Sequence, residues 1–136
     1  MCRLYRDGRL VTTAGVARRE GRYFLAQRRD GGAQSRRWEF PGGKCDADDA
    51  DEAERLRREF MEELDVEIDV GEELGTVLFE HKSTPYILVA YAIVLHAPPR
   101  RLSVHTDTGW FSPEEMVRLD LADSDRALIE RYIAPR

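Results

Sequence analysis

The hydrophobic pattern predicts β-strands in several parts of the chain. Residues 11–16 and 23–26 form two such segments around a polar turn that contains Gly21. Three later segments are rich in β-branched and aromatic residues: VEIDV, LGTVLFEH and YILVAYAIVL. The last of these is nearly all apolar, which is typical of a central strand covered on both faces. After a Pro-Pro turn, TGWF predicts one more strand.

Helical periodicity is clearest in residues 50–64, ADEAERLRREFMEEL. Its apolar residues recur at steps of three and four and form one stripe: Ala53, Leu56, Phe60 and Leu64. Either Asp49 with Glu52 or Asp51 with Glu54 would cap the start of this helix.

Two shorter helices are predicted near the C-terminus. Ser112 is placed as a cap, Pro113 as the first helical residue, and Glu115 three residues after the cap. Residues 124–133 are amphipathic. Strands mixed with helices indicate an α/β fold, a mixed sheet with helices on both sides. No repeat or linker interrupts the chain, so we expect a single domain over residues 1–136.

Composition and charge limit the possible partners and location of the protein. The 136 residues are 42% hydrophobic and 35% charged, as expected for a globular domain, and the net charge is −5. Without a broad basic field, a nucleic-acid polymer is not an expected partner. Cys2 and Cys45 lack metal-ligand spacing and indicate free thiols in a reducing compartment. With no signal peptide or long apolar run, we expect a cytoplasmic protein that does not bind membranes.

Three carboxylates crowd one face of the main helix. Glu59, Glu62 and Glu63 stand at the i, i+3, i+4 spacing, where like charges weaken an isolated helix. They lie beside the apolar stripe, near the edge of the buried face. A solvated acidic face, with Arg55 and Arg58 as partners, is one interpretation. A magnesium site is the other, because Mg²⁺ prefers carboxylates, water and phosphates as ligands.

The preceding glycine-rich loop separates these interpretations. WEFPGGK is followed by Arg58-Glu59 and then by Glu62-Glu63, and this order resembles the signature of the Nudix hydrolases. Gly43, Phe60 and Val66 also match the family pattern. WEFPGGK in particular resembles the MutT-type branch, which acts on the nucleotide pool, and the similarity extends over most of the chain.

The chain departs from the family pattern in three places. The spacing from Gly43 to Arg58 is one residue longer than the pattern. The pattern's first Glu, which normally braces the Arg, is replaced by one of Asp48, Asp49 or Glu52. Its terminal Gly is Asp65, so we expect either a left-handed residue there or a different end to the helix.

The resemblance implies a Nudix α/β/α sandwich with a mixed β-sheet. It also implies Mg²⁺-dependent hydrolysis, with Mn²⁺ as a substitute, of (deoxy)nucleoside triphosphates, including oxidised or modified ones, to monophosphate and pyrophosphate. The implied metal ligands are Glu59, Glu62, Glu63 and the Gly42 carbonyl. For the general base, Glu59 is the first choice and Glu63 the second.

The same resemblance suggests substrate contacts. Arg28 and Lys44 are expected to reach the phosphates, and Asp125 the nucleobase. The alternatives are a solvated strand-end arginine at Arg28 and a helix-cap acid at Asp125. Relatives carry an acidic or histidine group near the metals where His105 stands here, but a solvated loop histidine is the favoured interpretation.

Two other functions remain open. A hydrolase of ADP-ribose or another nucleoside diphosphate derivative is the first; relatives with that preference tend to carry a proline closer to the signature than Pro85. A non-catalytic nucleotide-sensing module is the second, and the complete set of three glutamates disfavours it. The sequence leaves open the preferred base and the choice between monomer and homodimer.

Overall fold

The computed structural model describes residues 5–32, 34–46 and 48–133. Its elements, in chain order, are β1 (Tyr5–Arg6), β2 (Arg9–Arg19), β3 (Arg22–Arg28), β4 (Trp38–Glu39), α1 (Glu52–Leu64), β5 (Ile68–His81), β6 (Thr84–Leu95), β7 (His105–Phe111), α2 (Pro113–Met116) and α3 (Asp123–Tyr132). In this part of the chain, seven strands form one mixed sheet. The predicted α/β fold with a mixed sheet is therefore confirmed.

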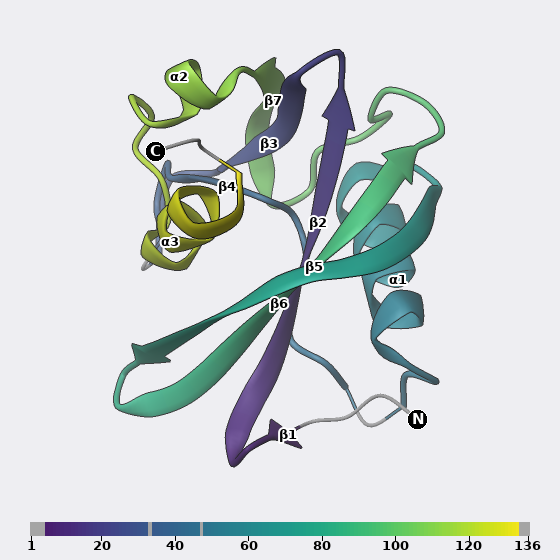
Figure 1. The fold of residues 1–136 in the computed structure, drawn as a ribbon. Coiled ribbons are helices and arrows are strands. Elements are labelled where there is room, and N and C mark those ends of the chain that lie inside the picture. The colour runs from purple at the N-terminus through teal and green to yellow at the C-terminus, as the bar shows by residue number, and fades with distance from the viewer. Residues whose placement is uncertain (1–4, 33, 47, 134–136) are drawn as a thin grey trace.

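The long strands β2, β5 and β6 organise the sheet. The main strand order is β4-β3-β2-β6-β5, with β1 pairing to β2 and β7 to β3. β2 and β6 run parallel, from the Leu10–Tyr86 pair to the Ala17–Ile93 pair, whereas β5 and β6 form an antiparallel hairpin. Figure 1 shows α1 and α3 on opposite sides of these three strands.

Each face of the sheet has its own apolar core. Alternation along the strands sends Leu25 to the core beneath α3 and the neighbouring Phe24 to the core beneath α1. The first core also contains Leu128 and Ile129 of α3, and the second contains Leu56, Phe60 and Leu64 of α1. β6 contributes to both cores, as its nearly continuous apolar sequence predicted.

Helix α1 is defined by acids at both of its ends. Asp51 caps the N-terminus, with its side chain accepting a hydrogen bond from the Glu54 backbone N–H at 2.7 Å. Of the two caps considered, the Asp51–Glu54 pair is therefore the one that forms. Asp65 ends the helix in the left-handed region, with φ 52° and ψ 52°. An aspartate thus takes the conformation for which the family pattern uses glycine.

The boundaries of some strands differ from the prediction. Residues 66–70 and 74–81 were expected as separate strands, but β5 is continuous from Ile68 to His81. The polar residues between Val70 and Gly75 lie at register shifts, where pairing is irregular, and both halves of β5 pair with β6. The two-residue strands β1 and β4 were not predicted, because their pairing depends on distant partners.

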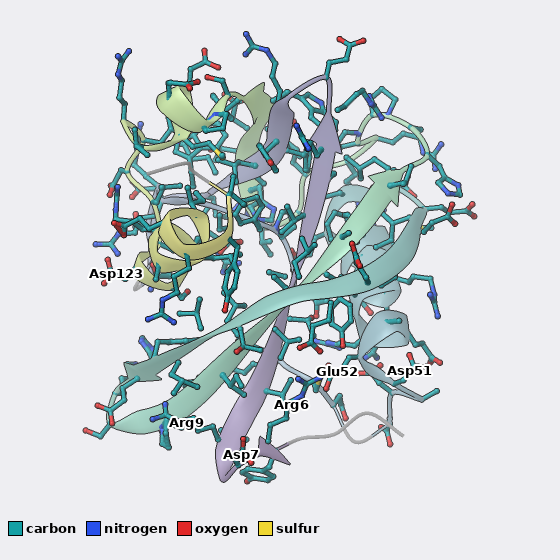
Figure 2. All side chains as sticks on the ribbon, in the orientation of Figure 1. Arg6, Asp7, Arg9, Asp51, Glu52 and Asp123 are labelled. Carbon is teal, nitrogen blue, oxygen red and sulfur yellow. The ribbon has the colours of Figure 1, made fainter. Side chains whose placement is uncertain are left out.

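The N-terminal segment is tied to the start of α1. Arg6 donates to the Glu52 carboxylate at 2.8 Å and to Glu73 at 3.1 Å, and the Tyr91 hydroxyl donates to Glu52 at 2.5 Å. Figure 2 shows Arg6 and Glu52 side by side below α1. This network fixes the first turn of α1 against the sheet, and with it the direction in which the helix carries its glutamates.

Two remaining sequence predictions concern thiols and membranes. The predicted thiol state of Cys45 stays a prediction, and Cys2 lies outside the described residues. Within the described ranges, none of the helices has the length and apolar character needed to cross a membrane.

Candidate active site

The glycine-rich loop is held against β2 by backbone hydrogen bonds. Thr13 donates from its N–H to the Gly43 carbonyl at 2.9 Å, and Gly15 donates to the Pro41 carbonyl at 2.8 Å. A Cβ at Gly42 would lie 1.9 Å from the Thr13 carbonyl oxygen, so this position requires glycine. Since successive carbonyls of an extended segment alternate in direction, the Gly42 carbonyl points away from β2.

Glu59 lies directly beneath this loop. Its side chain packs on Gly43, where an added Cβ would lie 2.8 Å from the Glu59 carboxyl carbon. The residue is only 7% exposed. It forms an ion pair with Arg55, one helical turn earlier, and a hydrogen bond with Glu63. Gly43 thus allows a carboxylate to approach the loop backbone closely.

Glu63 is a half-buried acid with an unsatisfied oxygen. Among the described residues, its Oε1 atom is buried and has no hydrogen-bond partner. Burial raises the pKa of Glu63 to about 9, helped by the hydrogen bond and charge of Glu59 and by the charge of Glu39, while Arg28 acts in the opposite direction. The Glu63 carboxyl therefore keeps its proton at neutral pH in the metal-free protein.

Glu62 differs from its two neighbours because its side chain is exposed. The solvated-face interpretation therefore describes Glu62 but not Glu59 or Glu63.

The structure identifies the acid that braces Arg58. Asp49 is 2% exposed, and its Oδ1 lies 2.7 Å from Arg58 Nη2. Of the three candidates, Asp48 is exposed and Glu52 instead binds Arg6 and Tyr91. Although the loop between Gly43 and Arg58 is one residue longer than the family pattern, a carboxylate still pairs with Arg58.

Glu39 connects several site residues, and sequence reasoning missed it. Its Oε2 lies 2.9 Å from His105 Nε2 and 3.5 Å from Arg28 Nη1. His105 is 1% exposed, so the favoured interpretation of a solvated loop histidine is wrong. The available signal was period-two alternation, which places Glu39 on the opposite face from the apolar Trp38 and Phe40.

Two adjoining cavities open beside these residues. The larger, about 400 Å³, is lined by Thr12, Arg28, Gly31, Gly32, Gln34, Glu39, Gly43, Lys44, Phe79, His81 and Tyr86. The smaller, about 160 Å³, is lined by Thr12, Thr13, Gln34, Glu39, Phe40, Gly42, Phe79, Leu88, Ala122, Ser124 and Asp125. Because they share four lining residues, including Glu39 and Phe79, the two cavities are neighbours.

Arg28 and Lys44 both line the larger cavity, as expected of phosphate-binding residues. Arg28 pairs with Glu39, so it is not merely a solvated strand end. Lys44 is exposed, and its Nζ atom lies 5.2 Å from the centre of the Tyr86 ring, which itself stacks on Phe79. The cavity therefore has two cationic side chains and an aromatic wall.

Asp125 closes the smaller cavity and does not cap α3. The helix begins after Ala122 with no side-chain cap, so the capping interpretation is wrong. Asp125 is 6% exposed and accepts a hydrogen bond from the Phe40 N–H at 2.9 Å. Burial, helped by the charge of Glu39 and opposed by the Phe40 hydrogen bond, raises the pKa of Asp125 to about 8. The carboxyl group is thus largely protonated at neutral pH.

The predicted metal ligands suit a hard divalent cation. They are the oxygens of Glu59, Glu62 and Glu63 and the carbonyl of Gly42, and Mg²⁺ prefers such ligands. Across the described residues, no three His, Cys, Asp or Glu side chains are already gathered into a metal cluster. The unsatisfied Glu63 oxygen is an atom that a cation would satisfy. The residue types therefore fit a magnesium ion, provided that their side chains turn toward it.

The arrangement of loop, helix and carboxylates agrees with comparisons to known proteins. A family model described as NUDIX domain matches residues 8–132. The chain belongs to the NUDIX family. Members of this family generally use divalent metal ions, and the chain is a hydrolase that acts on phosphoric anhydrides.

Individual relatives refine this assignment. The chain is 33% identical over 127 residues to the CTP pyrophosphohydrolase of Escherichia coli K12, covering 93% of each protein. It is 31% identical over 122 residues to the putative 8-oxo-dGTP diphosphatase 2 of Mycobacterium tuberculosis H37Rv, covering 88% of this chain and 84% of that protein.

A solved structure agrees with this. The crystal structure of a MutT protein from Methanosarcina mazei Go1 superimposes with a TM-score of 0.78 at 25% identity, over 89% of this chain and 90% of that one. Together these findings confirm the predicted MutT-type Nudix hydrolase and its α/β/α sandwich. They also support pyrophosphohydrolase activity on small nucleotide derivatives.

Proposed function

We propose that this Nudix protein hydrolyses (deoxy)nucleoside triphosphates, including oxidised or modified ones, to monophosphate and pyrophosphate in a Mg²⁺-dependent reaction. The observation that carries the proposal is the pair of adjoining cavities. The larger is lined by the cationic Arg28 and Lys44 and by Gly43, against which Glu59 of α1 packs, whereas the smaller is lined by the buried acid Asp125. A charged phosphate chain suits the first, and a nucleobase suits the second.

The phosphate end of the substrate lies in the larger cavity in this proposal. Arg28 and Lys44 bind phosphate oxygens, while Glu59, Glu62, Glu63 and the Gly42 carbonyl hold the Mg²⁺, for which Mn²⁺ substitutes. When bound, the metal neutralises phosphate charge and activates water for in-line attack. Substrate binding frees Glu39 from Arg28, since the guanidinium then has phosphate oxygens to bind.

Glu59 is the preferred general base. A base must be ionised and within hydrogen-bond reach of the attacking water. Glu59 forms an ion pair with the Arg55 guanidinium, whereas burial raises the pKa of Glu63 to about 9, so Glu63 is the poorer candidate for an ionised base before metal binds. This difference supports the order of preference that the sequence suggested.

Asp125 contacts the nucleobase in this proposal. A protonated carboxyl group both donates and accepts hydrogen bonds, so it pairs with a base edge that presents an amine beside a ring nitrogen acceptor, or an N–H beside a carbonyl. The relatives named for CTP and 8-oxo-dGTP make these two nucleotides the first candidates to test.

A substrate screen tests the proposal. Purified protein is incubated with canonical and damaged (deoxy)nucleoside triphosphates, nucleotide sugars and ADP-ribose, with Mg²⁺ or with EDTA. We expect a triphosphate to have the highest kcat/KM and to require Mg²⁺. A preference for ADP-ribose would favour the diphosphate-derivative alternative, and no hydrolysis of any compound would favour a sensor.

A further inference from the structure

Arg55 holds Glu59 in the metal-free protein. The two side chains are one helical turn apart on α1 and are 15% and 10% exposed, respectively. The Arg55 guanidinium pairs through Nη2 with Oε1 of Glu59, and its Nε lies 3.8 Å from Asp49 Oδ2. A pair so far removed from water is screened less than the usual i, i+4 pair on a helix surface.

This pairing matters because Glu59 is also a proposed metal ligand. The guanidinium already supplies a positive charge to the carboxylate. A divalent cation that binds Glu59 must either displace Arg55 or sit beside it, and both alternatives cost free energy. Either way, the ion pair opposes metal binding.

We propose that Arg55 is the internal counter-cation of Glu59: it positions the Glu59 carboxylate in the metal-free enzyme, competes with Mg²⁺ for it, and so sets the Mg²⁺ concentration that the enzyme needs. The inference rests on the metal site of the proposed function and adds a positioning residue to it. Release of Arg55 is the step that lets Glu59 turn from the arginine to the metal.

The other arginines of α1 do not share this role. Arg58 is bound to Asp49 at 2.7 Å and lies on the side of Glu62. Arg57 is exposed and carries the same charge on the same helix. Arg57 therefore provides a matched control for the general effect of removing one positive charge next to an acidic site.

The test measures Mg²⁺ binding directly, without substrate. Isothermal titration calorimetry and melting temperature against MgCl₂ concentration are recorded for the wild type, Arg55→Gln, Arg55→Lys and Arg57→Gln. Arg55→Gln should bind Mg²⁺ about tenfold more tightly, because the competing partly buried ion pair is gone. It should also melt lower in EDTA and gain more from saturating Mg²⁺. Arg57→Gln should stay within about twofold of the wild type, since exposed charges are screened.

Each other outcome argues against the inference. If Arg55→Gln binds Mg²⁺ no more tightly than Arg57→Gln, Arg55 does not compete with the metal, although the metal site itself stands. If Arg55→Lys behaves as Arg55→Gln does, charge at this position is not the cause. If Mg²⁺ produces neither heat nor a shift in melting temperature in any of the proteins, the proposed metal site is wrong and the inference fails with it.

Discussion

Two buried aspartates lie on opposite sides of the site and are stabilised in opposite ways. Asp49, beside α1, is 2% exposed and pairs with the Arg58 guanidinium. Asp125, at the start of α3, is 6% exposed and meets the Phe40 N–H, with the raised pKa described above. The first acid lies against an arginine in an ion pair, whereas burial favours the proton on the second.

The contrast separates the chemistry of the two sides. On the α1 side, carboxylates lie next to arginines. Negative and positive side chains together suit the binding of a metal ion and a phosphate. On the α3 side, the smaller cavity is lined by Asp125, whose raised pKa favours the neutral acid, and this suits an uncharged base. Glu39 lies between them and lines both cavities.

The largest expected effect tests the charged side. Glu62→Gln and Glu63→Gln keep side-chain size but remove a metal ligand, so each should lower kcat at fixed Mg²⁺ by roughly a hundredfold or more. Stability should be retained, because Glu63 is already protonated in the metal-free protein and Glu62 is exposed. Steady-state kinetics and melting curves check this, with Glu54→Gln on the same helix as control. A wild-type rate in either variant would remove that residue from the ligand set.

The next effect tests the neutral side. Asp125→Ala should lower kcat/KM for the preferred base by roughly ten- to a hundredfold, because the base loses a buried hydrogen bond. The difference in kcat/KM between the preferred base and a poor base should therefore become smaller. The kcat for a poor base should change little. The measurement is kcat/KM for two triphosphates that differ only in the base. An unchanged ranking of the two bases would exclude Asp125 from base selection.

A smaller effect tests the ion pair of Arg58, whose acidic partner the sequence left open. Asp49→Asn removes the buried partner of Arg58 and should lower the melting temperature, whereas Asp48→Asn, at an exposed neighbour, should not. Thermal unfolding of both variants in EDTA makes the comparison. Equal melting temperatures would show that the Asp49–Arg58 pair does not support the loop.

The smallest expected effect is a change in the pH dependence of stability. With its pKa at about 8 in the folded protein and near 3.8 when unfolded, Asp125 binds its proton more tightly in the folded state. Its contribution is therefore complete below about pH 4 and is lost as pH rises toward about 8.

Asp125→Asn should remove this loss, so the fall in melting temperature between about pH 5 and about pH 8 should be shallower than in the wild type. Asp123→Asn is the control, because that side chain is 94% exposed at the surface (Figure 2). The fall in melting temperature with pH should be shallower for Asp125→Asn than for this control. Equal slopes would mean that Asp125 is already ionised in the folded protein.

The two sides also differ in how far the sequence predicts them. The α1 side is contiguous: apolar spacing defines the helix, Asp51 its cap, and the glycine-rich loop precedes it. Local pattern therefore predicts the position of Glu59, Glu62 and Glu63. The same spacing puts Arg55 one helical turn before Glu59, as the solvated-face interpretation assumed, but it does not show that this ion pair is largely buried.

The α3 side depends on distant parts of the chain. Glu39 and His105 are 66 residues apart and meet only because β3 pairs with both β4 and β7. Asp125 resembles a helix cap in sequence, and only the approach of the Phe40 backbone shows its different role. Burial creates the unusual properties of these residues, and sequence pattern does not report burial at single polar positions.

In the proposed function, a charged, metal-binding side and a neutral, base-binding side together cleave a nucleoside triphosphate. Phosphorus NMR of the reaction with the best triphosphate and Mg²⁺ tests it most directly, because it identifies both products. We expect monophosphate and pyrophosphate in equal amounts, and no reaction in EDTA. Diphosphate with orthophosphate as the first products, or equal turnover without a divalent metal ion, would contradict it.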